Sequence, residues 1–472
     1  MEPLGLREHL EHPSGLGHEP DGAATGSAGG ALCGDLVQLR LRVEGDRVAD
    51  AGFDAHGCGA ARAAGSAAVH LVAGAPVLQA ARVGTGAIAA ELGGLSPGKL
   101  HAADLAADAL HQALGAAARA HAAVPADPDR TLIAMSGGVD SAVAALIVAR
   151  EGREAVAVTL ELWRDADNDA EASCCSASAV RAARAVAHGL SLPHFTLDLR
   201  AEFRAGVVQP WLDDHAAGLT PNPCVRCNGH VRLDAMVAFA DALGAADLAT
   251  GHYARKTADG LLRAAGDPAK DQAYMLAATS PATLARLRFP LGERTKPEVR
   301  ALAAEAGLAV AHKRESQDLC FLAGTGRAAF LAKHGRQDDR PGAITDAAGT
   351  RVGTHAGAHH FTVGQRKGIG VAAAEPLYVL ATDAVANTVT VGPRAQLATS
   401  EVAVRDAVLH RPAAEVEAVK LRYRSEALPC RVIGTGAGRL TLALDEPVLG
   451  AAPGQAAVLL RGDAVVGHAT IA

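Results

Sequence analysis

The stretch TLIAMSGGVDSAVAALIVAREG, Thr131–Gly152, decides the fold of the central part of the chain. Its first five residues are mostly apolar and are followed by turn residues, which is typical of a central parallel strand. Gly137 and Gly138 allow backbone conformations that other residues avoid, and Asp140 or Ser141 can cap the helix that follows. The free N–H groups at the start of that helix, together with two serine hydroxyls, predict a cradle for phosphate.

The sequence of this loop separates it from two common nucleotide-binding motifs. No Gly-Lys-Ser/Thr closes it, as in a Walker loop, and it lacks the spaced glycines of a dinucleotide fingerprint. The hexapeptide SGGVDS, Ser136–Ser141, resembles the pyrophosphate loop of the ATP-pyrophosphatase superfamily. That resemblance implies cleavage of ATP between the α and β phosphates and activation of a carbonyl oxygen as an adenylate. The alternative is a glycine-rich turn that binds no ligand.

Composition indicates a globular protein of several domains. The chain has 472 residues, of which 49% are hydrophobic and 20% charged. Eight cysteines are too few for a disulfide scaffold and favour catalysis or metal binding in a cytoplasmic protein. We expect no membrane span and no signal peptide. The net charge of −6 lies in residues 1–127, so charge alone does not indicate a nucleic-acid partner.

Changes of pattern along the chain predict the domain organisation. The central region alternates strands and helices, which predicts an α/β doubly wound parallel sheet whose ligands bind beyond the carboxyl ends of the strands. The C-terminal region has short strands and turns, which predicts a small β-barrel. The expected parts are a disordered arm (1–27), a scaffold-like α+β domain (28–121), a linker (122–130), a catalytic domain (131–334, with part of the central domain near 286–310), a central domain (335–396) and a barrel (397–472).

Eight short motifs, of which the loop is the first, occur in a fixed order, and together they are specific for one family. They are SGGVDS, TPNPCVRCN, ATGHYAR, KDQAYML, SQDLCF, HFTVGQRKGIG, VKLRYR and PGQAAVL. In this order they resemble the tRNA-specific 2-thiouridylase family from Thr131 to Ala472. The resemblance implies a pyrophosphate-loop catalytic domain, a central tRNA-binding domain and a C-terminal β-barrel. It also implies ATP- and Mg²⁺-dependent thiolation of the wobble uridine in tRNAs for Lys, Glu and Gln.

The resemblance assigns roles to matching positions. It implies that Cys320 carries a persulfide, received from a cysteine desulfurase or a sulfur-relay protein, and that Cys227 attacks this persulfide to release sulfur. The positions that match ATP contacts are Ala134, Met135, Ser136, Gly137, Gly138, Val139, Asp140, Ser141, Leu160 and Gly251. Those that match contacts to tRNA or its target base are Asn222, Pro223, Cys224, His252, Lys270, Asp271, Gln272, Arg422, Tyr423 and Gln455.

Cys224 departs from the family pattern, because many members have at this position an Asp to which an acid/base role is assigned. A thiol, with an unperturbed pKa of about 8.5, cannot simply replace a carboxyl group with a pKa of about 3.9. Cys224, Cys227 and Cys320 could instead hold an iron–sulfur cluster with one open iron, at which bound sulfide would be the donor. The persulfide and cluster mechanisms both stay open.

The first domain resembles the iron–sulfur scaffold (NifU/IscU-like) family over about residues 29–118. Cys33, Asp35 and Cys58 fall on ligand positions, but the third ligand cysteine is replaced by Ala102, which follows His101. The four remaining candidates, Cys33, Asp35, Cys58 and His101, could bind zinc or a labile cluster. The alternative is a domain without metal that is kept for docking a cysteine desulfurase.

The sequence therefore predicts a scaffold-like domain fused to a tRNA 2-thiouridylase. Two other interpretations stay open. One is a different adenylating enzyme of the same superfamily, which would lack the Cys227/Cys320 pair and the barrel. The other is an iron–sulfur or sulfur delivery protein in which the ATP domain only regulates release.

Overall fold

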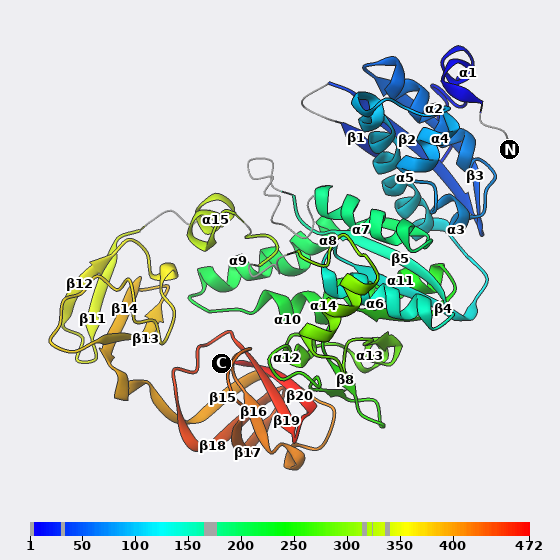
Figure 1. Ribbon diagram of the computed structural model, residues 1–472. Coiled ribbons are helices and arrows are strands. Elements are labelled where there is room, and N and C mark those ends of the chain that lie inside the picture. The colour runs from blue at the N-terminus through cyan, green and yellow to red at the C-terminus, as the bar shows by residue number, and fades with distance from the viewer. Residues whose placement is uncertain (1–3, 30–33, 165–176, 314–318, 323, 336–339) are drawn as a thin grey trace. The chain divides into compact units, whose positions relative to one another are not determined.

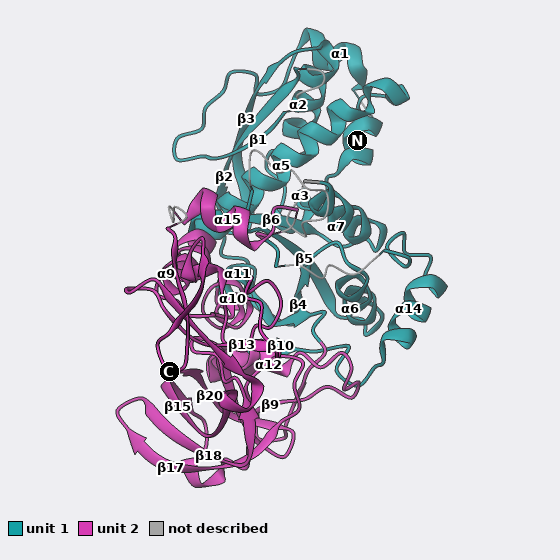
Figure 2. Ribbon diagram, turned by 90° about the vertical axis from the view of Figure 1, so that its left-hand side faces the viewer, with its two compact units in different colours: residues 1–201, 235–252, 286–320 teal, residues 202–234, 253–285, 321–472 magenta. Residues whose placement is uncertain are grey.

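The computed structural model describes residues 4–29, 34–164, 177–313, 319–322, 324–335 and 340–472 (Figure 1). The chain divides into two compact units, shown in teal and magenta in Figure 2. The first unit contains residues 1–201, 235–252 and 286–320, and the second contains residues 202–234, 253–285 and 321–472. Within the described residues, no helix is both long enough and apolar enough to cross a bilayer.

The N-terminal domain of the first unit contains an antiparallel three-stranded sheet, β1 (Ala24–Gly29), β2 (Leu36–Glu44) and β3 (Arg47–His56), in the order β1-β2-β3. Alternate residues of β2 are buried, as period-2 patterning requires. The helices of this domain are α1 (Gly5–Glu11), α2 (Gly59–Val72), α3 (Val77–Ala80), α4 (Thr85–Glu91), η1 (Pro97–Lys99) and α5 (Leu100–His121). The long helix α5 packs on β1 and β2.

The predicted disordered arm, residues 1–27, is wrong for its described part, because α1 and most of β1 lie there. Buried His9 fixes α1, since its Nδ1 lies 2.8 Å from Ser66 Oγ. The small residues of β1 allow close packing: a Cβ at Gly26 would lie 2.1 Å from the Ala109 carbonyl oxygen of α5. Low hydrophobicity in this segment therefore reflects close packing and not disorder.

The catalytic domain of the first unit has a five-stranded parallel sheet in the order β10-β7-β4-β5-β6. This sheet confirms the predicted doubly wound α/β fold. The strands are β4 (Asp127–Met135), β5 (Glu154–Glu161), β6 (His194–Asp198), β7 (Ala245–Thr250) and β10 (Leu287–Arg288). Its helices are α6 (Val139–Arg150), α7 (Ala177–Gly189), α14 (Lys296–Glu305) and α11 (Leu233–Ala242), which spans the boundary between the units.

The edge strand β6 is covered by the N-terminal domain. The His194 N–H donates to the Ala81 carbonyl oxygen (2.9 Å), and the His111 side chain of α5 lies 2.7 Å from the His194 carbonyl oxygen. A Cβ at Gly115 would lie 1.9 Å from the Thr196 carbonyl oxygen, so α5 approaches the strand closely. These contacts give hydrogen-bond partners to backbone N–H and C=O groups that would be unpaired at an exposed sheet edge.

The second unit contains a helical region followed by two β domains. The helical elements are α8 (Arg200–Phe203, at the unit boundary), the π-helical turns η2 (Arg204–Val208) and η3 (Asn228–Arg232), α9 (Gln209–Ala216), α10 (Pro223–Cys227), α12 (Ala273–Leu276), α13 (Pro281–Arg286) and α15 (Arg327–His334). The central domain is a four-stranded sheet of β12 (Arg351–His355), β11 (Gly342–Asp346), β14 (Thr388–Pro393) and β13 (Leu377–Asp383).

The C-terminal strands close into a barrel, which confirms the prediction. Their order is β15-β18-β17-β16-β19-β20, and β15 also pairs with β20. The strands are β15 (Ala398–Leu409), β16 (Ala418–Lys420), β17 (Leu428–Gly436), β18 (Arg439–Leu449), β19 (Ala456–Arg461) and β20 (Ala464–Ile471), with the short β9 (Leu262–Arg263) and β8 (Arg255–Lys256) beside β20. Buried aliphatic side chains such as Val419, Leu442 and Leu459 fill its interior.

Candidate active site

The loop after β4 has the conformation that an anion-binding turn needs. Gly137 has a φ of +67°, and a Cβ there would lie 2.6 Å from the Ala179 carbonyl oxygen. The N-cap of α6 is Gly138, and no side chain caps the helix, so the expected capping by Asp140 or Ser141 is wrong. The Ser141 hydroxyl donates instead to the Gly138 carbonyl oxygen (3.1 Å) and accepts from the Ser136 N–H (3.1 Å). The first N–H groups of α6 therefore carry no side-chain cap.

Two lysines outside the predicted site reach this loop. Lys296 Nζ lies 2.7 Å and 2.8 Å from the two carboxylate oxygens of Asp140, and Lys313 Nζ donates to the Gly137 carbonyl oxygen (2.9 Å). Lys296 begins α14, which a capping box between Thr295 and Glu298 fixes. No local sequence motif marks either lysine.

Two other predicted ATP positions lie at the carboxyl ends of neighbouring strands. Gly251 follows β7, and a Cβ on it would lie 2.7 Å from the Ser141 N–H nitrogen. Leu160 is buried near the end of β5. His252, predicted to contact tRNA, follows Gly251 and shares a hydrogen bond of 2.8 Å with Thr250 Oγ1. The sheet therefore brings Gly251 directly against the loop, as expected for this edge.

Cys224 and Cys227 lie on the short helix α10 in the second unit. Asn222 is its N-cap, because its Oδ1 accepts hydrogen bonds from the N–H groups of Cys224 (3.1 Å) and Val225 (3.3 Å). Pro223 occupies the first helical turn, where its missing N–H costs nothing. Cys227 is buried and Cys224 is half-buried. Asn222 and Pro223 thus shape the helix that carries both thiols.

Cys320, the last residue of the first unit, is half-buried. It lies in a short turn, and the next residue, Phe321, is 4% exposed. A half-buried thiol beside a fixed residue suits a sulfur carrier, which a donor protein must reach.

The remaining predicted tRNA positions lie in the segment before α12 and in the barrel domain. Asp271 Oδ1 accepts from the N–H groups of Ala265 and Ala273, and Gln272 Oε1 accepts from the Tyr253 N–H (3.0 Å). Arg422 donates to the Gly450 carbonyl oxygen (2.5 Å). Tyr423 packs near Tyr274, with 6.1 Å between ring centroids. Lys270 and Gln455 make backbone hydrogen bonds to Asp267 and Ala452.

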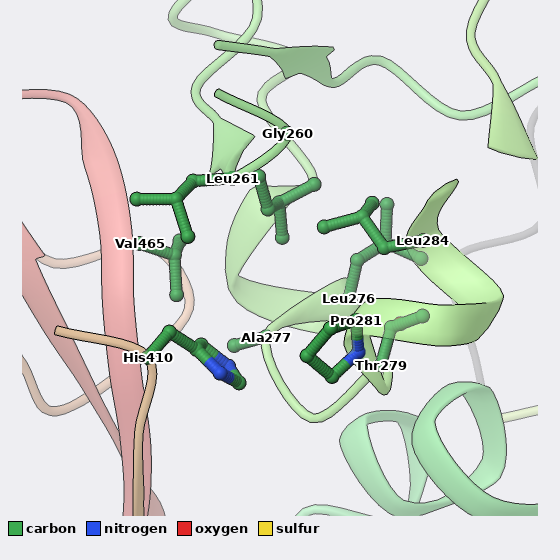
Figure 3. Close-up of a pocket in the computed structure, with 10 residues that line it drawn as sticks. Gly260, Leu261, Leu276, Ala277, Thr279, Pro281, Leu284, His410 and Val465 are labelled. Atoms are coloured by element: carbon green, nitrogen blue, oxygen red, sulfur yellow. The ribbon is translucent and has the colours of Figure 1, made fainter. Parts of the chain in front are cut away.

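A small recess lies between β20 and the segment that carries α12 and α13 (Figure 3). Its lining is mainly apolar, and Thr279 and His410 supply the polar groups. Its volume of about 30 Å³ is enough for roughly one water molecule. It is too small for a nucleotide base and contributes nothing to the candidate active site.

The N-terminal domain gathers three of the predicted metal ligands. Asp35, Cys58 and His101 each offer a ligand atom, and these atoms lie within 4.8 Å of one another. Asp35 Oδ1 accepts from the Cys58 N–H (2.7 Å), and this bond contributes most to lowering the pKa of Asp35. His101 Nδ1 lies 3.0 Å from the Gly98 carbonyl oxygen, and its Nε2 lies 3.1 Å from Asp35 Oδ2. Cys33 lies outside the described residues.

Comparisons with known proteins decide the family. The chain is 43% identical over 486 residues to the bifunctional protein NifU/MnmA of Rubrobacter xylanophilus, covering 98% of this chain and 97% of that protein. The chain belongs to the tRNA-specific 2-thiouridylase family. The tRNA-specific 2-thiouridylase MnmA of Methylorubrum extorquens is 43% identical, over 72% of this chain and 91% of that protein. The tRNA-specific 2-thiouridylase MnmA of Geobacter metallireducens is 40% identical, over 72% of this chain and 95% of that protein.

Family profiles divide this 2-thiouridylase homologue into four segments. Residues 5–122 match a NifU-like N-terminal domain, and residues 129–324 match a tRNA methyl transferase HUP domain. Residues 328–393 match a tRNA methyl transferase PRC-barrel domain, and residues 400–471 an aminomethyltransferase β-barrel domain. The resemblances to the 2-thiouridylase and scaffold families are therefore confirmed.

Proposed function

We propose that this protein is a tRNA-uridine 2-sulfurtransferase that thiolates the wobble uridine of tRNAs for Lys, Glu and Gln. The observation that carries the proposal is the turn of Gly137 and Gly138 ahead of α6, which has no side-chain cap. Gly251 packs against the start of this helix, and the chain belongs to the 2-thiouridylase family. The proposed setting is the cytoplasm.

In the first step, the C2 oxygen of uridine attacks the α phosphate of ATP, and pyrophosphate leaves. The loop Ser136–Ser141 would hold the departing phosphates through backbone N–H groups and hydroxyls. The Asp140 carboxylate is an oxygen ligand of the kind that Mg²⁺ prefers, and bound Mg²⁺ would offset phosphate charge. Lys296 and Lys313 add positive charge beside the same loop. The uridine C2 then carries AMP as a good leaving group.

In the second step, sulfur replaces AMP at C2. Cys320 would carry a persulfide, and the Cys227 thiolate would attack the Cys320 sulfur atom. A Cys227–Cys320 disulfide forms, hydrosulfide is released to attack C2, and AMP leaves with the original oxygen. An external thiol reductant must then reduce the disulfide, and a cysteine desulfurase or sulfur-relay protein must reload Cys320. Alternatively, Cys224, Cys227 and Cys320 hold an iron–sulfur cluster, which would supply sulfide when bound.

The two mechanisms differ in their need for iron. The full chain with Cys33→Ser and Cys58→Ser, which removes the thiols of the N-terminal site, should be reconstituted anaerobically and assayed for iron and sulfide. The cluster mechanism predicts bound iron that Cys224→Asp removes together with activity. The persulfide mechanism predicts iron-free protein that thiolates tRNA when a desulfurase is supplied.

For the N-terminal domain we propose a metal-binding site at Asp35, Cys58 and His101, which would hold zinc or a labile cluster. Two nitrogen or sulfur ligands and one carboxylate match zinc chemistry. A domain that only docks a desulfurase is the alternative. The zinc content of the full chain separates these two alternatives. His101→Ala should lower the zinc content if the domain binds metal, and should leave it unchanged if the domain only docks a desulfurase.

Nucleoside analysis of tRNA tests the function in cells. A strain that lacks the gene should lose 2-thiouridine derivatives, and the parent gene should restore them while Asp140→Ala should not. Unchanged 2-thiouridine in the deletion strain would favour a delivery protein with a regulatory ATP domain. A different adenylated product would favour another enzyme of the superfamily.

A further inference from the structure

Four aromatic rings of the second unit form a buried cluster beside Cys320. Phe321 packs edge-to-face against Trp211, Phe330 and Phe203, with centroid distances of 5.3, 5.2 and 6.0 Å. None of these four side chains is more than 4% exposed. Each edge-to-face pair adds about 0.5–1.5 kcal/mol to the stabilisation that burial of the ring area gives. Because these pairs depend on ring orientation, they restrain where the Phe321 ring lies as well as keeping it buried.

The helical segment that supplies two of these rings also contacts the helix of Cys227. Phe203 ends α8 and Trp211 lies on α9, with the π-helical turn η2 between them. Arg226 Nε donates to the Gly206 carbonyl oxygen of η2 (2.6 Å). A Cβ at Gly206 would lie 2.6 Å from Val231 Cγ2 of η3, the turn that follows Cys227. Residues 202–216 therefore contact both Phe321 and the segment that carries Cys227.

We propose that residues 202–216 form a frame that holds Phe321 and that Phe321 is the positioning residue for the Cys320 thiol. The inference rests on the proposed sulfur-carrier role of Cys320. A peptide bond joins Cys320 to Phe321, so a side chain fixed by three rings limits where the preceding thiol can move. The thiol itself is half-buried and stays reachable. π-Helical turns within such a frame are frequent at functional sites.

The test compares two ring deletions in the full chain. Phe321→Leu and Phe330→Leu each remove one ring from the same cluster, but only Phe321 is joined to the cysteine. For each variant we would measure 2-thiouridine formed per pyrophosphate released with tRNA, because adenylation does not need Cys320. Trp211 fluorescence in a Trp163→Phe background reports cluster packing. Phe321→Met conserves much of the side-chain volume, so it can be measured if Phe321→Leu does not fold.

The expected result is a drop of the sulfur-to-pyrophosphate ratio by about 10-fold or more in Phe321→Leu, because misplacement by 1 Å can cost 10²-fold. Phe321→Met should show a smaller drop, and so should Phe330→Leu, which removes only one of the three rings that contact Phe321. An unchanged ratio in Phe321→Leu, or an equal drop in both Leu variants, would overturn the inference. Normal thiolation by Cys320→Ser would instead refute the sulfur-carrier role, so the two failures are distinguishable.

Discussion

Lys296 and Asp140, which are 156 positions apart in the sequence, form a charged pair at the start of the pyrophosphate loop helix. Lys296 Nζ lies 2.7 Å and 2.8 Å from the two carboxylate oxygens, and the lysine side chain is 9% exposed. The pair places a buried cation beside the loop that is proposed to receive phosphates. The carboxylate proposed to bind Mg²⁺ is thereby held in place by α14.

We predict that Lys296→Gln lowers tRNA-dependent pyrophosphate release by roughly 10²-fold, as the loss of one preorganised charge-stabilising group does in other enzymes. Steady-state kinetics with ATP and tRNA would measure it. Lys99→Gln, at an exposed lysine of the same unit, is the control and should keep the parent rate. Parent kinetics for Lys296→Gln would exclude this lysine from the ATP site.

Gly251→Ala should damage the loop by steric overlap. The new Cβ would lie 2.7 Å from the Ser141 nitrogen, so the start of α6 must shift. We expect destabilisation by about 1–3 kcal/mol, as is typical of overpacking, together with a raised KM for ATP. Gly189→Ala, where a Cβ meets nothing within 4 Å, is the matched control. Thermal unfolding and ATP kinetics that match between the two variants would contradict the described packing.

Cys227→Ser and Cys320→Ser should each abolish 2-thiouridine formation and leave tRNA-dependent pyrophosphate release intact. Cys430→Ala is the control, because burial raises the pKa of the Cys430 thiol to about 11 and it lies in the barrel core. Mass spectrometry of the tRNA nucleosides would measure the product. Either serine variant thiolating at the parent rate would remove that cysteine from the mechanism.

Acid should destabilise the aromatic cluster through His215, whose ring lies 4.3 Å from that of Trp211. Burial lowers the pKa of His215 from 6.5 to about 4. Between these values the unfolded chain binds more protons than the folded one, so the unfolding free energy falls as the pH drops from 6.5 to 4. The full shift is worth roughly 3 kcal/mol.

Thermal unfolding of the parent and His215→Gln from pH 7.5 to pH 5 tests this effect. Glutamine cannot be protonated, so the parent should lose stability relative to the variant as the pH falls below about 6.5. A constant difference in Tm across this range would show that His215 does not titrate on unfolding.

Local patterns were enough to predict the sheet, the barrel and the loop, because each strand, helix and turn that builds them has its own short sequence signature. Gly137 has a positive φ, Gly138 is the N-cap of α6, and Gly251 packs against the start of that helix, as a tight turn at this edge requires. Lys296 and Lys313 could not be predicted, because they reach the loop only through the tertiary packing of α14 and the segment after it. The N-terminal arm was mispredicted because its small residues resemble a disordered composition while they pack closely against α5.

The most direct test of the proposed function is the nucleotide product formed with purified full-length protein, ATP, Mg²⁺, a sulfur donor and unmodified tRNA for Glu. We predict AMP and pyrophosphate, formed only when tRNA is present and in equal amounts to 2-thiouridine at the wobble position. ADP as the product, or AMP formation that is independent of tRNA with no 2-thiouridine, would contradict the proposal.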